Sequence, residues 1–302
     1  MDGQYDRLIQ IAGEDAVFTD EPMSRHTSFR IGGPADYFIT PKTEESLKML
    51  EEYCRKQELP FCVIGNGTNL LVSDEGVRGI VISTCDGMTG LCFEDLQVTA
   101  QAGVLLSKLA NAAAKKSLTG LEFAAGIPGS LGGGITMNAG AYGGEMKDVL
   151  VSADVYVPGE GIITFAADEL KLGYRTSLIK EKGYTVLSAK LQLEEGDEAA
   201  IRARMDELKT SRVSKQPLDY PSAGSAFKRP EGYFAGKLIS DAGLKGCTIG
   251  GAQVSEKHAG FVINRGDARS SDVLLLIDHI KAVLLERFGV EIETEVVYVP
   301  EK

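Results

Sequence analysis

A glycine-rich stretch at residues 126–144 constrains this chain more than any other segment. Its sequence, GIPGSLGGGITMNAGAYGG, places a glycine at almost every second or third position and contains no charged side chain. Glycine destabilises helices and strands, so a dense run indicates left-handed turns or a main chain that closely approaches a ligand. A flexible linker is the alternative, but Ile127, Leu131 and Ile135 interrupt the glycines, unlike the polar residues of a solvated spacer. We therefore predict a ligand-binding segment.

The overall composition excludes several classes of protein. The chain has 302 residues, enough for about two domains, and carries 32 Lys and Arg against 43 Asp and Glu, for a net charge of −11. This acidic balance argues against nonspecific nucleic-acid binding, which needs a basic face. No apolar run reaches the roughly 18 residues of a membrane span, and no signal-peptide pattern opens the chain. We expect a cytoplasmic protein without a membrane partner, and the sequence does not specify its oligomeric state.

Cysteine and histidine are few and scattered. The five cysteines include no CxxC pair, so we expect buried reduced thiols rather than a disulfide framework or a zinc ribbon. The three histidines have no metal-ligand spacing. We therefore predict no metal site.

A second glycine turn, GNGTN at residues 65–69, lies between two predicted strands, 61–64 and 70–72. A strand that runs into a glycine turn is the arrangement of phosphate-binding loops, although such a turn alone is equally a feature of hairpins. Leu70 replaces the third glycine of a Rossmann motif and no GK[ST] follows, so neither common nucleotide motif is present. Together, the two glycine stretches could hold a pyrophosphate and a flat ring through main-chain donors. Two purely structural turns are the alternative.

The remaining pattern mixes helices and strands. Apolar periodicity and turn residues predict a short N-terminal helix, a helix capped by Thr43, a hairpin at Pro158 and Gly159, and a helix ended by Gly289. The other predicted elements are two short strands within residues 27–40, helices at 105–116, 197–213 and 271–288, and a final strand at 291–299. We expect the charged helix at 197–213 to be a solvated linker.

Three polar residues outside the glycine stretches have side chains suited to catalysis. Arg175 in GYRTS could stabilise an anion or enolate, Ser225 in SAGSAF could donate a proton, and Glu295 in EIETEV could polarise or protonate a neighbour. By spacing alone, a salt bridge, a turn serine and an edge-strand carboxylate are the alternatives.

Four basic residues concentrate around Ser225. They are Lys215, Lys228, Arg229 and Lys237. In an acidic chain, an anionic substrate such as a phosphate or carboxylate would explain this cluster. A solvated basic patch explains it equally well.

Eight ordered motifs closely resemble the UDP-N-acetylenolpyruvoylglucosamine reductase family. They are IGGPADYFI, VIGNGTNLLVSD, AGIPGSLGGGITMNAGAYG, GYRTS, AGSAFKRP, AGKLISDAGLKG, GGAQVSEKHAGFVIN and IETEV. The resemblance extends from about residue 25 to the C-terminus. An ordered set of eight motifs is far more specific than a single glycine loop.

The resemblance implies an α+β fold, with a two-part FAD-binding region of the vanillyl-alcohol-oxidase (PCMH) type and a smaller α+β substrate-binding domain. The implied divisions are 1–84, 85–196 and 197–289, with the last strand, 290–302, returning to the first. It also implies non-covalent FAD, NADPH as co-substrate, and reduction of UDP-N-acetylglucosamine enolpyruvate to UDP-N-acetylmuramate by hydride from flavin N5. FAD would lie against the following residues: Gly65, Asn66, Gly67, Thr68, Asn69, Gly126, Ile127, Pro128, Gly129, Ser130, Gly132, Gly133, Asn138, Ala139, Gly140, Ala141 and Gly143.

The same resemblance assigns roles to single residues. Ser225 matches the proton donor, and Arg175 and Glu295 match the two residues that stabilise the enolic intermediate. Lys215, Lys228 and Arg229 are implied substrate contacts. Residue 229 is arginine where longer members have asparagine, and the run from Leu193 to Ser214 has no room for their tyrosine loop, so this chain resembles the shorter type.

Two other functions fit a chain of this kind. One is an FAD oxidase of the same superfold that acts on an alcohol or sugar. The other is a non-catalytic protein that binds nucleotide sugars and keeps the fold.

Overall fold

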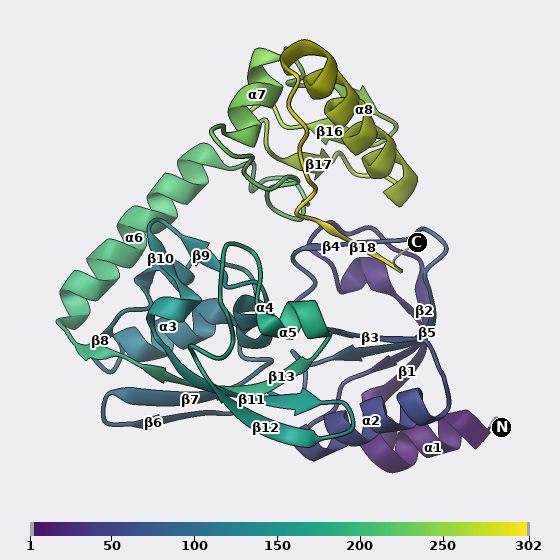
Figure 1. Cartoon of the computed structure of the whole chain (residues 1–302), viewed down its shortest axis with the longest axis vertical. Coiled ribbons are helices and arrows are strands. Elements are labelled where there is room, and N and C mark those ends of the chain that lie inside the picture. The colour runs from purple at the N-terminus through teal and green to yellow at the C-terminus, as the bar shows by residue number, and fades with distance from the viewer. Residues whose placement is uncertain (1–2, 301–302) are drawn as a thin grey trace. The chain divides into compact units, whose positions relative to one another are not determined.

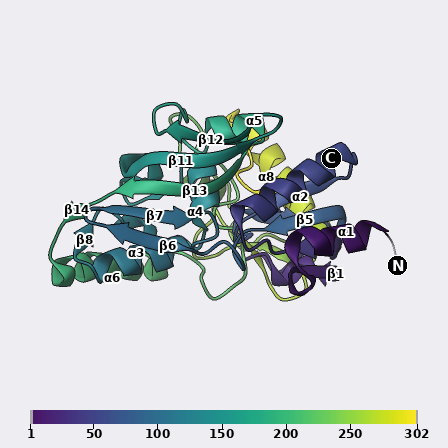
Figure 2. The ribbon, with the colours of Figure 1, turned by 90° about the horizontal axis from the view of Figure 1, so that it is seen from below.

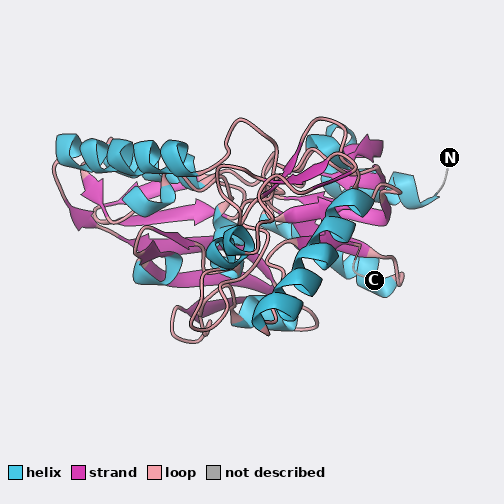
Figure 3. Ribbon diagram, turned by 90° about the horizontal axis from the view of Figure 1, so that it is seen from above, coloured by secondary structure: helices cyan, strands magenta, loops and turns pink. Residues whose placement is uncertain are grey.

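The computed structural model describes residues 3–300, which form both helices and strands (Figure 3). The chain forms two compact units (Figure 1). Unit 1 comprises Met1–Thr19, Tyr37–Asn66 and Gly79–Ser211, and unit 2 comprises Asp20–Asp36, Gly67–Arg78 and Arg212–Lys302. The predicted division at residues 84, 196 and 289 stays a prediction.

A four-stranded sheet with two helices forms the first part of the fold, with strand order β1-β2-β5-β3. Helix α2 begins where Thr43 predicts it, because the Thr43 side chain accepts a hydrogen bond from the Ser46 amide. Leu47 and Leu50 of α2 are fully buried in this core. The elements are α1 (Gly3–Ala12), β1 (Val17–Pro22), β2 (Pro34–Ile39), α2 (Glu44–Lys56), β3 (Phe61–Ile64) and β5 (Val77–Ser83).

A five-stranded antiparallel sheet forms the larger part of unit 1, with strand order β12-β11-β13-β7-β6 (Figure 2). The predicted hairpin is confirmed, since Val157 of β11 pairs with Gly161 of β12. The strands are β6 (Leu91–Glu94), β7 (Gln97–Gln101), β11 (Leu150–Val157), β12 (Gly161–Ala166) and β13 (Thr185–Gln192).

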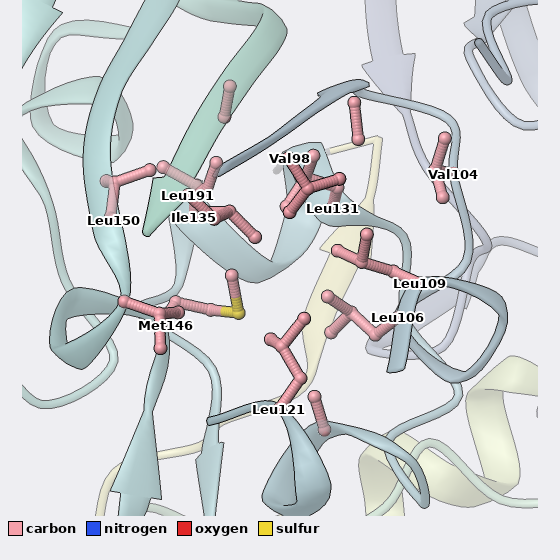
Figure 4. Packing of buried hydrophobic residues seen from close by; sticks show 14 of the residues in the cluster. Val98, Val104, Leu106, Leu109, Leu121, Leu131, Ile135, Met146, Leu150 and Leu191 are labelled. Carbon is pink, nitrogen blue, oxygen red and sulfur yellow. The ribbon is translucent and has the colours of Figure 1, made fainter. Parts of the chain in front are cut away.

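Three short helices accompany this sheet. Figure 4 shows Leu106 and Leu109 of α3 gathered with Leu131 and Ile135 of α4 and Val98 of β7 in one apolar core. Burying such side chains stabilises the fold by about 25 cal/mol per Å² of apolar surface. The core therefore fixes α4, which lies inside the glycine-rich stretch. The helices are α3 (Leu106–Ala114), α4 (Leu131–Thr136) and α5 (Leu178–Lys182).

Unit 2 packs two helices with a three-stranded antiparallel sheet, β15-β16-β17, and with the parallel pair β4 and β18 (Figure 1). Val273, Leu276 and Ile280 form the buried face of α8, and Gly289 ends that helix in the left-handed conformation, as predicted. The elements are β4 (Leu70–Val72), α7 (Ala235–Asp241), β15 (Thr248–Ile249), β16 (Ala252–Val254), β17 (Val262–Asn264), α8 (Ser270–Phe288) and β18 (Val297–Val299).

The charged helix forms as α6 (Glu198–Lys215). Its exposed side chains pair along the helix, with Arg202 bonded to Glu198 and Arg204 bonded to Glu207. These i,i+3 and i,i+4 pairs are typical of a solvated helix surface, as predicted.

Two predicted strands differ from the structure. Residues 28–31 form a turn instead of a strand, because Thr27 Oγ1 donates to the Ile31 carbonyl oxygen and Arg30 adopts a positive φ of 54°. The last strand is shorter than predicted and covers only Val297–Val299. Residues 293–295 bond instead to the segment that contains Ser225.

Among residues 3–300, no helix is long and apolar enough to cross a membrane. All five cysteines are free. The prediction that they are buried is correct for Cys54 but wrong for Cys92, which is exposed on β6. Burial raises the pKa of Cys54 and Cys62 to about 12. Both groups are therefore protonated thiols at neutral pH.

Candidate active site

Close packing within the protein leaves no room for a side chain at four glycines of residues 126–144, namely Gly132, Gly134, Gly140 and Gly144. A Cβ on Gly132 would lie 2.9 Å from the Cβ of Ala102, and one on Gly134 would lie 3.1 Å from Leu106 Cδ1. The Gly132 amide donates to the Ala102 carbonyl oxygen, and the Gly133 amide donates to Ser130 Oγ, which caps α4. The expected left-handed turn occurs at Gly143, with a φ of 92°. Close packing therefore explains part of a pattern that the sequence assigns wholly to turns or a ligand.

The two glycine stretches meet in unit 1. Asn66 Nδ2 donates to the Pro128 carbonyl oxygen over 2.5 Å. A Cβ on Gly65 would lie 2.1 Å from Ser130 Oγ, so only glycine fits beside that serine. Residues 65–66 and 128–130 thus form one continuous surface, although they are about 60 positions apart in sequence.

The turn that begins at Asn66 has three successive main-chain amides without an acceptor among the described residues. Within residues 3–300, the amides of Asn66, Gly67 and Thr68 make no hydrogen bond. Gly67 is left-handed with a φ of 58°, and a Cβ there would lie 1.9 Å from the His26 carbonyl oxygen. Successive amides around a left-handed glycine form a concave site for an anion, such as the pyrophosphate of a dinucleotide.

Asn138 connects the long glycine stretch to the loop that contains Arg175. Its side chain is 1% exposed; Nδ2 donates to Glu145 Oε2 over 2.7 Å and to the Gly173 carbonyl oxygen over 3.2 Å. Its Oδ1 accepts from the Lys147 amide over 3.0 Å. The sequence places Asn138 only against the cofactor, whereas its side chain also binds two other segments, residues 145–147 and the loop at Gly173.

Arg175 lies at the tip of this loop in unit 1. It has a positive φ of 56°, between Gly173 and Thr176, which bond to each other through both main-chain groups. Fully buried Ser177 anchors the next residues by donating to the Thr136 carbonyl oxygen of α4 over 2.7 Å. The half-buried Arg175 guanidinium stacks 5.3 Å from the Tyr174 ring centre. The glycine stretch therefore fixes the position of the loop that carries this cation.

Ser225 and Glu295 lie on adjacent segments of unit 2. The Glu295 amide donates to the Ala226 carbonyl oxygen over 2.9 Å, and the Lys228 amide donates to the Glu293 carbonyl oxygen over 2.9 Å. The Ser225 hydroxyl donates to the Phe227 carbonyl oxygen over 3.1 Å, and Ser225 follows Gly224, which has a φ of 77°. This pairing brings a hydroxyl and a carboxylate, separated by 70 positions in sequence, into one local region.

The predicted basic cluster is partly neutralised. Lys228 Nζ lies 2.6 Å from Glu293 Oε2 and holds the pKa of that carboxyl below its ordinary value. Lys237 pairs with Asp241 at 2.8 Å. Arg229 stacks 4.0 Å from the Phe234 ring centre. Lys215 is exposed at the end of α6. Two of the four cations thus have carboxylate partners within their own unit.

Two family models match the chain in separate regions. The model for an FAD binding domain matches residues 35–166, and the model for the C-terminal domain of UDP-N-acetylenolpyruvoylglucosamine reductase matches residues 216–299. The first region contains both glycine stretches, and the second contains Ser225 and Glu295. FAD is therefore the dinucleotide that suits the glycine site.

Curated relatives match along almost the whole chain. UDP-N-acetylenolpyruvoylglucosamine reductase from Lachnoclostridium phytofermentans is 52% identical over 299 residues, which cover 98% of this chain and 96% of the relative. The protein of the same name from Clostridioides difficile is 49% identical and is covered to 96%.

Solved structures agree with these relatives. The crystal structure of UDP-N-acetylenolpyruvylglucosamine reductase from Thermus caldophilus matches with a TM-score of 0.79 and 37% identity, and the match covers 94% of this chain and 98% of that one. Alkyldihydroxyacetonephosphate synthase shares the fold alone over 65% of the chain, with a TM-score of 0.50 and 16% identity. The predicted α+β fold with an FAD-binding region is confirmed. This chain belongs to the UDP-N-acetylenolpyruvoylglucosamine reductase family.

Proposed function

We propose that this chain reduces UDP-N-acetylglucosamine enolpyruvate to UDP-N-acetylmuramate, with NADPH as reductant and non-covalent FAD, in the synthesis of peptidoglycan precursors. The observation that supports this proposal most directly is the pairing of the Ser225 and Glu295 segments. That pairing occurs in a chain 52% identical to a named reductase. A cytoplasmic location belongs to the same proposal.

The residues around the two glycine stretches suit FAD. The amides of Asn66, Gly67 and Thr68 would bind its pyrophosphate. Contacts with the other predicted glycine-stretch residues are part of this proposal. When bound, FAD accepts two electrons from NADPH and delivers them as a hydride to the enolpyruvyl methylene carbon.

Arg175, Ser225 and Glu295 would complete the reduction of the double bond. Addition of hydride to the methylene carbon places the electron pair of the broken π bond on the carboxylate as an enolate. The Arg175 guanidinium would stabilise that charge, and the Glu295 carboxyl, in its protonated form, would donate a hydrogen bond to it. The Ser225 hydroxyl would then give its proton to the neighbouring carbon, which produces the lactyl ether, and the serine would regain a proton from water.

The Ser225 hydroxyl needs to rotate for this role. Its hydroxyl donates to the Phe227 carbonyl oxygen, so the hydrogen must turn from that oxygen toward the substrate carbon. A serine hydroxyl rotates readily because only one bond is exchanged.

The cations near Ser225 would bind the sugar nucleotide. Arg229 and Lys215 carry positive charge at the surface, and a diphosphate is the anionic group that such side chains recognise. Lys228 would have to exchange Glu293 for a phosphate oxygen, because the two side chains are paired at 2.6 Å.

The decisive experiment measures NADPH oxidation by the FAD-loaded protein with and without the enolpyruvyl sugar nucleotide. We expect consumption to require that acceptor. Equal rates in its absence would refute the proposal. Oxygen consumption on an alcohol or sugar without NADPH would indicate an oxidase, and a colourless protein that cannot be reconstituted with FAD would indicate a binding protein.

A further inference from the structure

Asn69 ends the short glycine turn, yet its side chain is directed at the segment that contains Glu295. Its Nδ2 donates to the Glu295 carbonyl oxygen over 2.9 Å, and its own carbonyl oxygen accepts from the Val297 amide over 2.9 Å. The strands that follow continue this contact, since Leu70 pairs with Val297 in the parallel pair β4 and β18. All these residues lie in unit 2.

These bonds hold Glu295 from two sides. Its amide is bound by the Ala226 carbonyl oxygen, next to Ser225, and its carbonyl oxygen is bound by Asn69. A residue with both main-chain groups fixed has little freedom to rotate, so its side chain starts from a defined position. Of these two bonds, the one from Asn69 comes from a side chain, so a substitution can remove it without changing the main chain.

We propose that Asn69 is a positioning residue that fixes Glu295 relative to Ser225 for protonation of the substrate, an inference that rests on the proposed roles of those two residues. The same asparagine directly follows the three amides that suit the FAD pyrophosphate. One turn thus serves both the dinucleotide and the carboxylate. The resemblance assigns Asn69 to FAD, and its side-chain amide in addition donates to the Glu295 carbonyl oxygen.

The chain offers a matched control of the same chemistry. Asn111 Nδ2 donates to the Ser107 carbonyl oxygen over 2.8 Å, on the exposed side of α3 and outside the proposed site. Replacement of Asn111 by alanine removes the same kind of bond. It should leave both half-reactions unchanged.

The test separates reduction of the enzyme by NADPH from its reoxidation by substrate in a stopped-flow spectrometer. In Asn69→Ala, we expect reoxidation to slow by about tenfold to a hundredfold, because small displacements of a reacting group have effects of that order. Reduction by NADPH should change by less than about twofold, since an effect confined to one half-reaction indicates a step-specific loss. Asn69→Asp keeps the shape but replaces the donor with an acceptor, so it should slow the same step.

A double-mutant cycle with Glu295→Gln distinguishes positioning from a general structural effect. If Asn69 acts through Glu295, Asn69→Ala should slow reoxidation no further in the Glu295→Gln background. Two outcomes would overturn the inference. In one, the double variant is slowed by the product of the two single effects on reoxidation. In the other, Asn69→Ala is reoxidised at the normal rate while Glu295→Gln is slow. Normal reoxidation in Glu295→Gln itself would refute the proposed role of Glu295. Thermal unfolding identifies any variant that fails to fold, and if Asn69→Ala fails, the same cycle is measured with the isosteric Asn69→Asp.

Discussion

The Glu295 amide donates to the Ala226 carbonyl oxygen over 2.9 Å. This bond joins the end of the chain to the segment of the proposed proton donor, because Ala226 directly follows Ser225. Ala226 is itself held from the other side, since its amide donates to the Gly260 carbonyl oxygen over 2.8 Å. Main-chain pairing therefore brings the segments of the two proposed catalytic groups of unit 2 together.

Replacing Ser225 with alanine should affect one half-reaction only. NADPH should still bleach the flavin, whereas reoxidation by the enolpyruvyl substrate should slow by about 10²- to 10⁴-fold, the usual contribution of a positioned acid. Ser225→Cys keeps a dissociable proton and should slow reoxidation less. Equal losses in both half-reactions would show that Ser225 does not act as the proton donor.

Replacing Asn138 with alanine should destabilise the protein. The side chain is 1% exposed and makes three hydrogen bonds, to Glu145, Lys147 and Gly173. Leaving such buried partners unpaired costs about 1–3 kcal/mol. Urea unfolding should show that loss. The control Asn111→Ala, at an exposed position, should have a free energy of unfolding close to that of the wild type. The KM for the sugar nucleotide should also rise, because the loop that carries Arg175 loses its hydrogen bond to Asn138. An unchanged free energy of unfolding would contradict this account.

Local sequence rules predicted much of this fold. Strands β3 and β4, the Thr43 cap and the Gly289 stop all follow from apolar periodicity and from residues with special conformations. These signals lie within a few residues of the structures that they specify. These elements can therefore be predicted without knowledge of the rest of the chain.

Long-range pairing could not be predicted in this way. Residues 293–295 have a strand-like pattern but bond to residues 226–228, and Asn69 bonds to a residue 226 positions away. An asparagine side chain can bind a ligand, a cap or a distant carbonyl group, and its neighbours in sequence do not distinguish these partners. The sequence therefore identifies the candidate residues. The hydrogen bonds that hold the loop of Arg175 and the segment of Glu295 are seen only in the structure.

Ionisation of Glu51 should lower the free energy of unfolding as the pH rises. Burial raises the pKa of this 1% exposed carboxyl, against the opposing effects of Thr185 and Arg55. The folded state therefore binds more protons than the unfolded state above pH 4.5, the ordinary value, and stability is lost as pH rises through the folded pKa. Glu51→Gln should thus become progressively more stable than wild type as pH rises from about 4.5.

Urea unfolding of both proteins across that pH range measures the difference directly. Exposed Glu52→Gln on the same helix is the control and should show no such trend. A difference that shrinks toward neutral pH would mean that the ion pair with Arg55, at 3.2 Å, outweighs burial.

The junction of the two glycine stretches predicts a compensating pair of substitutions. A Cβ on Gly65 would lie 2.1 Å from Ser130 Oγ but 3.2 Å from Ser130 Cβ. The hydroxyl cannot turn away freely, because it caps α4 by accepting from the Gly133 amide. Gly65→Ala should therefore lower the melting temperature and the FAD content of the purified protein, and Ser130→Ala alone should cost about 1 kcal/mol through the lost cap.

The double variant should retain more FAD than Gly65→Ala alone, because removal of the hydroxyl relieves the shorter of the two contacts. Flavin absorbance and thermal unfolding, with and without added FAD, measure both effects. A Gly65→Ala protein that binds FAD as tightly as wild type would place the cofactor away from this junction. A double variant worse than either single one would show that the cap at α4 matters more to this site than the space beside Gly65.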